Sequence, residues 1–152
     1  MTTGGSSPAR MKIRRARPSD AARIAELSGQ LGYPTSTKQM TARLKQALRE
    51  KTGACFVAET KEQGVVGWVH VSVTPLLEVE RRAEVHGLVV DANVRSQGTG
   101  ARLLGAAEAW ARTMRCAGMS VRSNILRERA HGFYQRQGYE HYKTQKAFRK
   151  AF

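Results

Sequence analysis

The sequence predicts a single α/β (α+β) domain in which helices flank a mostly antiparallel sheet. The chain of 152 residues has the usual size of one domain. Its apolar content of 41% and charged content of 25% are ordinary for a globular protein. Strand-like and helix-like segments follow one another in the order βααβββαβαβ, without a repeat or a domain break. We expect a flexible leader at 1–10 and the domain at 11–152.

The N-terminal part predicts a strand at 11–16 and two helices that are marked by their caps. Ser19 fits the N-cap of the first helix, with Asp20 in its first turn, and Ser36 with Gln39 fits a capping box for the second. Both helices carry an apolar stripe, formed by Ile24, Leu27, Ser28 and Leu31 in the first and by Met40, Leu44, Ala47 and Leu48 in the second.

The pattern in the middle of the chain predicts a hairpin, followed by a further strand that precedes a glycine-bearing turn. Residues 54–60 and 65–73 read as two strands joined by a turn that ends at Gly64. Pro75 stops the second strand, and a connection leads to a further strand at 83–90. Strict alternation would place Glu84, His86, Leu88 and Val90 on one face of that strand, and Val85, Gly87 and Val89 on the other.

A glycine-bearing turn at 95–100 follows that strand and opens directly into a helix at 98–115. The unpaired N–H groups and the positive dipole end of such a helix favour an anion, usually a pyrophosphate. An ordinary strand-to-helix turn is the alternative, since glycine favours both. The spacing fits neither GxxxxGK[ST] nor GxGxxG. A strand at 119–124, a helix at 127–137 and closing strand material at 139–148 complete the order.

Composition excludes several classes of function. No apolar run approaches the roughly 20 residues of a membrane span, and the N-terminus has no apolar export segment. Cys55 and Cys116 stand apart from each other and from any histidine at ligand spacing, which indicates free thiols in a reducing cytoplasm and no metal site. The net charge of +14 attracts anions, but its dispersal along the chain is less typical of a nucleic-acid groove than of solubility and cofactor steering.

Two motifs follow one another in the second half of the chain. Arg95, Gly98 and Gly100 form an R-x-x-G-x-G motif after the fourth strand, and the second motif comprises Asn124, Ala130, Phe133, Tyr134 and Gly138. Together they closely resemble the GNAT superfamily of acetyl-CoA-dependent N-acetyltransferases, whose signature at the first motif is Q/R-x-x-G-x-G/A. The resemblance covers about residues 11–150. It implies a mixed sheet of about six to seven strands flanked by four helices, with the fourth and fifth strands parallel and splayed.

The resemblance also implies how acetyl-CoA, as co-substrate, would be held. The backbone of the glycine-bearing turn would bind the pyrophosphate, and the pantetheine would pair with the fourth strand like an additional strand. The implied contacts are Leu88, Val89, Val90, Arg95, Ser96, Gln97, Gly98, Thr99, Gly100, Ala101, Asn124, Ala130 and Tyr134.

The same resemblance suggests the catalytic groups. Tyr134 lies where many members place the acid that protonates the CoA thiolate, although it also suits simple packing beside Phe133. Glu84 and His86, two apart on the strand, are alternative bases for the amine. Their structural alternatives are a surface ion pair for Glu84 and a packing role for His86.

The acceptor is an amine, and the family resemblance favours a small molecule. Tyr33, His70 and Glu78 are the residues that we expect near it. A protein or charged-tRNA amine, or a non-catalytic acyl-CoA-binding regulator, are the alternatives. Dimers are common in the family, but no residue here establishes one.

Overall fold

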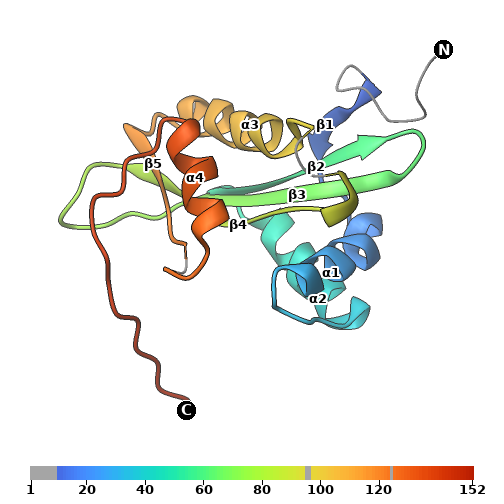
Figure 1. Ribbon diagram of the computed structural model, residues 1–152. Helices are drawn as coiled ribbons and strands as arrows, with labels where there is room; N and C mark the ends of the chain where they lie inside the picture. The colour runs from blue at the N-terminus through green and yellow to red at the C-terminus, as the bar shows by residue number, and fades with distance from the viewer. Residues whose placement is uncertain (1–9, 95–96, 124) are drawn as a thin grey trace. The chain divides into compact units, whose positions relative to one another are not determined.

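The computed structural model describes residues 10–94, 97–123 and 125–152 (Figure 1). Residues 1–9 of the expected leader, together with Arg95, Ser96 and Asn124, lie outside the described residues. Backbone contacts divide the chain into two compact units, Met1–Val121 and Arg122–Phe152. In the described part, no helix combines the length and apolar character needed to cross a membrane.

The first unit is built on a five-stranded sheet whose strands lie in chain order. The strands are β1 (Lys12–Arg15), β2 (Gly53–Thr60), β3 (Gly64–Val73), β4 (Arg82–Val90) and β5 (Gly118–Val121). The first four pair antiparallel with their neighbours, and β4 pairs with β5 in parallel. The predicted fold class and the parallel pair are confirmed, but the described strands number fewer than the six to seven expected.

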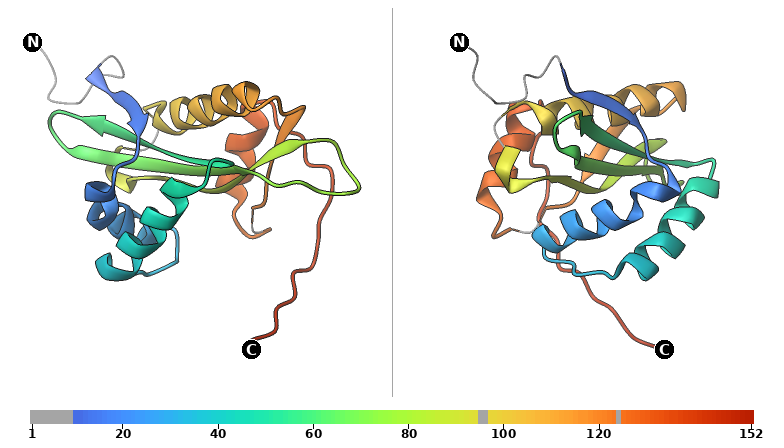
Figure 2. Two further views of the ribbon diagram at one scale, coloured as in Figure 1. Left: turned by 180° about the vertical axis from the view of Figure 1, so that it is seen from behind. Right: turned by 90° about the vertical axis from the view of Figure 1, so that its right-hand side faces the viewer.

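Helices cover both faces of this sheet (Figure 2). The helices of this unit are α1 (Ala21–Gln30), α2 (Thr37–Arg49) and α3 (Thr99–Thr113). α1 and α2 lie on one face, and α3 lies on the other. The capping box of α2 is confirmed, since Gln39 N donates to Ser36 Oγ and Ser36 N donates to Gln39 Oε1, both at 3.1 Å.

The start of α1 differs from the prediction. Ser19 is not its N-cap, because a short 3₁₀ turn precedes α1 and Asp20 occupies the cap position. The Asp20 carboxylate accepts from Arg17 N at 2.8 Å and from the Arg14 guanidinium at 2.8 and 2.9 Å. A carboxylate that satisfies a backbone donor and a charged donor at once anchors the turn better than a hydroxyl does.

Strand β4 does not alternate strictly, because a β-bulge interrupts its pairing with β3. His70 lies opposite Gly87, whereas Val71 lies opposite Val85, so His86 has no opposite residue. A bulge of this kind shifts the alternation by one residue. The predicted grouping of Glu84 and His86 with Leu88 and Val90 is therefore wrong.

The packing shows which residues of β4 share a face. Gly87 lies under the Trp68 indole, with 2.6 Å from the ring to an added Cβ, and Val89 belongs to the core beneath α1 and α2. Gly67, opposite Val90, faces α3 instead, where an added Cβ would lie 2.9 Å from the Leu103 side chain. Thus Gly87 and Val89 share the α1/α2 face of β4, and the bulge lets polar side chains continue this face towards Arg82.

The second unit contains α4 (Glu128–Arg136) and a C-terminal segment. Gly138 has a φ of +92°, as expected of the C′ residue that ends a helix. The strand expected at 139–148 is wrong, since these residues form no strand. The face that would carry Tyr142 and Phe148 also carries Lys146, so the segment lacks a continuous apolar side to bury.

Candidate functional site

The two parallel strands of the sheet are paired over only part of β4. Pairing runs from Arg82 with Gly118 to Val85 with Val121, whereas β4 continues to Val90. Among the described residues, no strand therefore covers the far edge of β4 beyond Val85. Backbone N–H and C=O groups along such an edge can pair with an extended ligand. The predicted contacts Leu88, Val89 and Val90 all lie on this stretch.

The predicted anion site lies directly after β4. Gly98 is the N-cap of α3 with a φ of +80°, a conformation that favours glycine. No heavy atom of the described residues lies within 4 Å of a Cβ added there. The first backbone bond of α3 runs from Arg102 N to Gly98 O at 3.1 Å. The N–H groups of Thr99, Gly100 and Ala101 thus have no acceptor within the helix. Open space, positive dipole and unused donors fit a pyrophosphate.

Other predicted members of this turn differ in what the structure says of them. Gln97 is exposed beside Gly98, and the side chain of Thr99 is buried. Arg95, Ser96 and Asn124 lie outside the described residues, so their predicted contacts stay predictions.

Side chains of α1 bond to the turn between β4 and α3 and hold it in place. The sequence did not lead us to predict these contacts. The Asp91 carboxylate accepts from Arg23 Nη2 at 2.5 Å, and from its own turn through Asn93 N at 3.0 Å. Gln30 donates to Asp91 at 3.5 Å and accepts from Ala92 N at 2.9 Å. The Asn93 amide, followed by Arg23 and Gln30, holds the pKa of Asp91 below its ordinary value. Arg23 and Gln30 are seven apart on one helix, but nothing local indicates a partner more than 60 residues away.

Four polar side chains from β3 and β4 meet beside the bulge. Ser72 Oγ lies 2.5 Å from His86 Nε2, and Glu84 Oε2 lies 3.7 Å from His86 Nδ1. The His70 ring lies 5.1 Å from the His86 ring. The structure therefore brings together three predicted residues and adds Ser72. Ser72 could have been found in the sequence from its position two residues after His70 on the same strand.

The charge of Glu84 favours the tautomer of His86 in which Nδ1 carries the ring hydrogen. In that tautomer Nε2 accepts from the Ser72 hydroxyl. The distance of 3.7 Å is too long for a hydrogen bond, so Glu84 acts on His86 through charge. Burial, and secondly the charge of His86, lower the pKa of His70, which therefore stays neutral at pH 7. In this cluster, the His86 imidazole thus has a serine hydroxyl at one ring nitrogen and a carboxylate facing the other.

Trp68 borders the cluster on β3. Its Nε1 is buried and has no hydrogen-bond partner among the described residues. Because Gly87 has no side chain, the Trp68 indole can approach the backbone of β4 closely. Together they make an apolar floor next to His70.

Tyr134 belongs to the second unit, where it lies on α4 one turn after Ala130. Both side chains are half-buried. The Tyr134 ring meets Phe133 edge-on at 5.2 Å and Tyr139 at 6.0 Å, so it does pack in the way the structural alternative expects. Burial also raises the pKa of Tyr134 above 10.0, against a smaller opposite effect of Arg127. The phenol is thus protonated at neutral pH.

The remaining predicted acceptor residues lie in loops. Tyr33 follows α1, and Glu78 lies in the connection between β3 and β4; both are exposed. The structure does not bring either into the His86 cluster by a described contact. Among the described residues, no group of three or more His, Cys, Asp or Glu is arranged to hold a metal ion.

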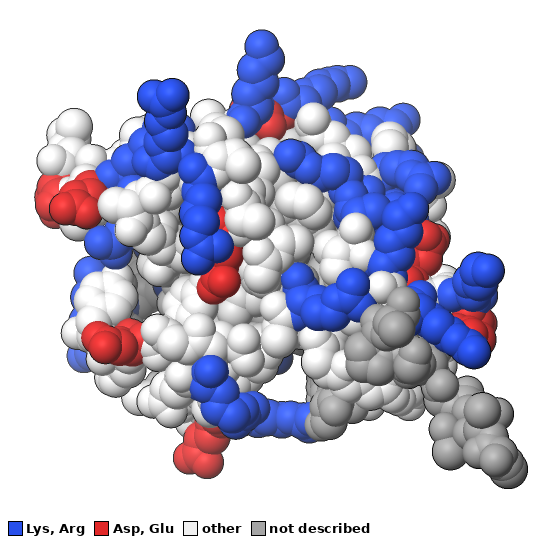
Figure 3. Space-filling view, turned by 90° about the horizontal axis from the view of Figure 1, so that it is seen from above, with Lys and Arg blue, Asp and Glu red and all other residues white. Residues whose placement is uncertain are grey.

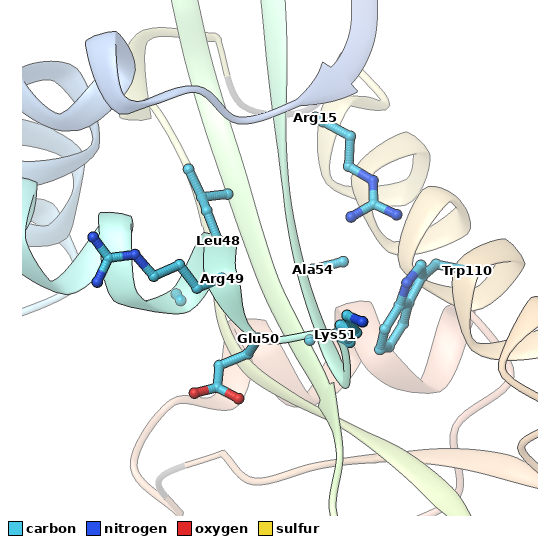
Figure 4. Close-up of a pocket in the computed structure, with 9 residues that line it drawn as sticks. Arg15, Leu48, Arg49, Glu50, Lys51, Ala54 and Trp110 are labelled. Carbon is cyan, nitrogen blue, oxygen red and sulfur yellow. The ribbon is translucent and has the colours of Figure 1, made fainter.

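A pocket of about 310 Å³ lies elsewhere in the first unit (Figure 4). Arg15 and Lys51 point towards Trp110, while Arg49 and Glu50 point away from it. Trp110 is eleven residues beyond Thr99 on α3, about 16 Å along the helix. None of the predicted site residues lines this pocket.

Comparisons with known proteins identify a family and a common fold. A family model described as the Acetyltransferase (GNAT) family matches residues 21–139. A comparison with curated protein sequences gave no match. Among solved structures, the aminoglycoside N-acetyltransferase AAC(6')-Iy in complex with CoA aligns with a TM-score of 0.84 at 18% identity, covering 98% of this chain and 99% of that one.

Two further structures are similar. The aminoglycoside antibiotic 6'-N-acetyltransferase AAC(6')-Ih from Acinetobacter baumannii has a TM-score of 0.82 at 18% identity, over 93% of this chain and 99% of that one. A transcriptional regulator from Bacillus halodurans C-125 has a TM-score of 0.78 at 23% identity, over 91% and 99%. At such identities these likenesses concern the fold.

Proposed function

This chain belongs to the GNAT acetyltransferase family, and on that premise we propose that it moves the acetyl group of acetyl-CoA to a primary amine of a small molecule. The observation that carries the proposal is the His86 cluster, which lies where β4 loses its pairing with β5. A base is thereby next to the strand edge that suits the pantetheine, and the anion turn follows a few residues later.

The amine must lose a proton to attack the thioester, and His86 is the group that receives it. Its lone pair on Nε2 faces Ser72, so the amine proton passes to Ser72 Oγ as the hydroxyl proton moves to Nε2. Glu84 stabilises the imidazolium that results. We assign Glu84 this supporting role because its carboxylate faces His86 Nδ1, whereas Ser72 faces Nε2 on the other side of the ring.

The attack completes in a ternary complex. The amine nitrogen bonds to the carbonyl carbon, the C–S bond breaks, and Tyr134 donates its phenolic proton to the departing thiolate. The raised pKa of Tyr134 supports this role, because a general acid must be protonated at the working pH.

A small-molecule acceptor is supported by the floor of Trp68 and Gly87 beside the base, which suits a compact apolar body bearing an amine. Similar structures that carry the names of aminoglycoside acetyltransferases point the same way. His70 borders this floor, and Tyr33 and Glu78 stay candidates for outer contacts.

A thiol-release assay with acetyl-CoA over amines, amino acids, peptides and charged tRNA tests the proposal. We expect turnover with a small amine, and turnover confined to peptides or tRNA would contradict the substrate class. His86→Gln should lower kcat about 10²- to 10⁴-fold with little change in the KM for acetyl-CoA. His141→Gln, the same change in the second unit, serves as the control; equal loss in both variants would remove the base assignment.

A further inference from the structure

The direct-attack reaction needs only a base for the amine. The cluster also contains the Ser72 hydroxyl, which can act as a nucleophile itself. Ser72 Oγ is 2.5 Å from His86 Nε2, the ring nitrogen that keeps its lone pair in the tautomer favoured by Glu84. Glu84 faces the opposite nitrogen. Serine, imidazole and carboxylate in this order form a nucleophile, its base and the group that stabilises the charged base.

The order arises from the pairing of two neighbouring strands. Ser72 and Glu84 are directly opposite across β3 and β4, and the bulge inserts His86 beside them. In a regular ladder His86 would stand opposite His70. The bulge leaves His86 without an opposite residue, next to the Ser72–Glu84 pair.

The cluster is open to a substrate. The side chain of His86 is 36% exposed and that of Glu84 is 19% exposed. In the described residues, the backbone edge of β4 beyond Val85 has no strand partner, so N–H groups along this edge are candidates for the donors of the cluster. Such donors are what the oxyanion of an acyl-transfer intermediate requires.

The other conventional nucleophiles of the first unit are less suited. Burial raises the pKa of Cys55 to about 12, which leaves almost no thiolate at neutral pH. Cys116 lies after α3, away from β3 and β4 in the chain. His70, whose pKa is lowered, adds no positive charge that would compete with protonation of His86.

We propose that Ser72 is an acyl-accepting nucleophile and that the protein has a second, hydrolytic activity towards activated acetyl esters and thioesters. Ser72 Oγ bonds to the carbonyl carbon while its proton moves to His86 Nε2. The bond to the leaving group breaks, and His86 gives the proton that it took from Ser72 to a departing thiolate, or to solvent when the group leaves as p-nitrophenolate. The product of this half-reaction is an acetyl ester on Ser72.

Water completes the cycle when no amine is present. It attacks the ester carbonyl and gives a proton to His86, the bond between the acetyl carbon and Ser72 Oγ breaks, and His86 returns the proton to the serine. Acetate and the free leaving group are the products. With acetyl-CoA as donor the activity rests on the proposed function, but the serine chemistry itself does not need CoA.

The test uses p-nitrophenyl acetate with the full-length chain, without CoA or amine. We expect p-nitrophenolate release, a protein mass raised by one acetyl group, and the label on the peptide that contains Ser72. Neutral hydroxylamine should remove this label, because it cleaves esters and leaves acetyl-lysine intact. Ser72→Ala should abolish the label, and His86→Gln should slow its formation at least about 10²-fold.

Ser120→Ala is the matched control, since Ser120 is a half-buried strand serine opposite Glu84 on β5. It should label like the unmodified sequence. A label that is hydroxylamine-stable, that lies on another residue, or that persists in Ser72→Ala would overturn the proposal. If amine transfer occurs but Ser72 is never labelled, only this inference fails. If Ser72 is labelled but no amine is acetylated, only the proposed function fails.

Discussion

The hydroxyl of Tyr134 is the only part of that side chain that the proposed acid role needs, because the ring is already packed against Phe133 and Tyr139 in the second unit. Removing the oxygen while keeping the ring separates packing from chemistry. Because burial raises the pKa of the phenol above its ordinary value, Tyr134 keeps its proton at physiological pH, so deprotonation of this group should not limit the rate there.

Tyr134→Phe should lower kcat about 10²-fold or more while the affinity for acetyl-CoA changes little. Tyr139→Phe removes a hydroxyl from the neighbouring ring and is the control. Steady-state kinetics and equilibrium binding of acetyl-CoA measure the two quantities. An unaltered kcat in Tyr134→Phe would leave the residue with packing alone.

Individual residues also show what a sequence can reveal. Glu84, His86 and His70 were recognisable because their chemistry is rare on strands and their spacing is short. Ser72 was not, since serine on a strand is common and its role depends on a partner fourteen residues away. Ser19 was misassigned because its neighbour Asp20 competes for the same position with a charged group.

At the scale of elements, two glycines share a backbone conformation but not a location. Gly98 has a φ of +80° at the start of α3, and Gly64 has a φ of +69° in the turn between β2 and β3. In the part of the chain that the structure describes, no heavy atom lies within 4 Å of a Cβ added at either glycine. They therefore allow a test of the anion turn in which backbone strain is matched.

Gly98→Glu should abolish measurable acetyl-CoA binding, because a carboxylate would occupy the position of the phosphate, in a protein that still folds. Gly64→Glu should bear a similar strain of about 1 kcal/mol and bind acetyl-CoA normally. Calorimetric titration and thermal unfolding check both variants. Equal affinities in the two variants would refute the phosphate assignment.

The bracing of the β4–α3 turn by α1 predicts an effect of pH. The lowered pKa of Asp91 means that its carboxylate stabilises the fold above the ordinary value near 4, and that this stability is lost as the pH falls towards the folded-state pKa. Asp91→Asn should therefore cost about 2 kcal/mol at pH 7, and the difference from the unmodified sequence should narrow below pH 4.

Urea unfolding at pH 7 and pH 3 measures this difference. Glu26→Gln is the control, because Glu26 bonds to the same Arg23 at 2.9 Å but is 67% exposed, and should cost less than about 0.5 kcal/mol. A constant difference between the Asp91 variant and the unmodified chain at both pH values would contradict a charge-based brace.

Elements were predictable where local signals coincide with tertiary packing. The capping box of α2, the hairpin of β2 and β3 and the glycine that ends α4 all depend on a few adjacent residues. The bulge in β4 was not predictable, because the apolar residues continue on both sides of His86 and only the pairing with β3 shows the shift. The brace on Asp91 likewise joins residues that are distant in the sequence.

At the scale of the whole molecule, the main feature of the surface is its positive charge. Lys and Arg are spread around the face shown in Figure 3, with a few carboxylates between them and no single basic groove. A net charge of +14 at such a surface attracts multiply charged ligands over distances near the Debye length. This distribution suits steering of CoA phosphates better than the reading of a nucleic acid.

The association rate of acetyl-CoA should accordingly fall several-fold between about 0.05 and 0.5 M salt. S-acetylpantetheine, which lacks the nucleotide phosphates, should show a nearly flat response and is the control ligand. Stopped-flow binding measures both rates. The same salt response for the two ligands would exclude steering by the phosphates.

The class of the fold followed from the order of elements over the whole chain, but the number of strands did not. The order βααβββαβ is present as predicted up to Val121. The closing segment has aromatic residues that suggested a strand, yet lysines interrupt its faces. An edge strand needs a partner as well as a pattern, and the sequence alone does not supply that information.

The chain order of the strands has a consequence for synthesis on the ribosome. Because β1 to β4 each pair with the next strand to emerge, Ser72, His86 and Glu84 can meet before the anion turn has been translated. β5 can pair with β4 only after the α3 crossover has been synthesised, so the pairing of β4 with β5 is the last part of the sheet to form. Proteolysis of stalled nascent chains would show protection of β2–β4 first, and simultaneous protection of β5 would contradict this order.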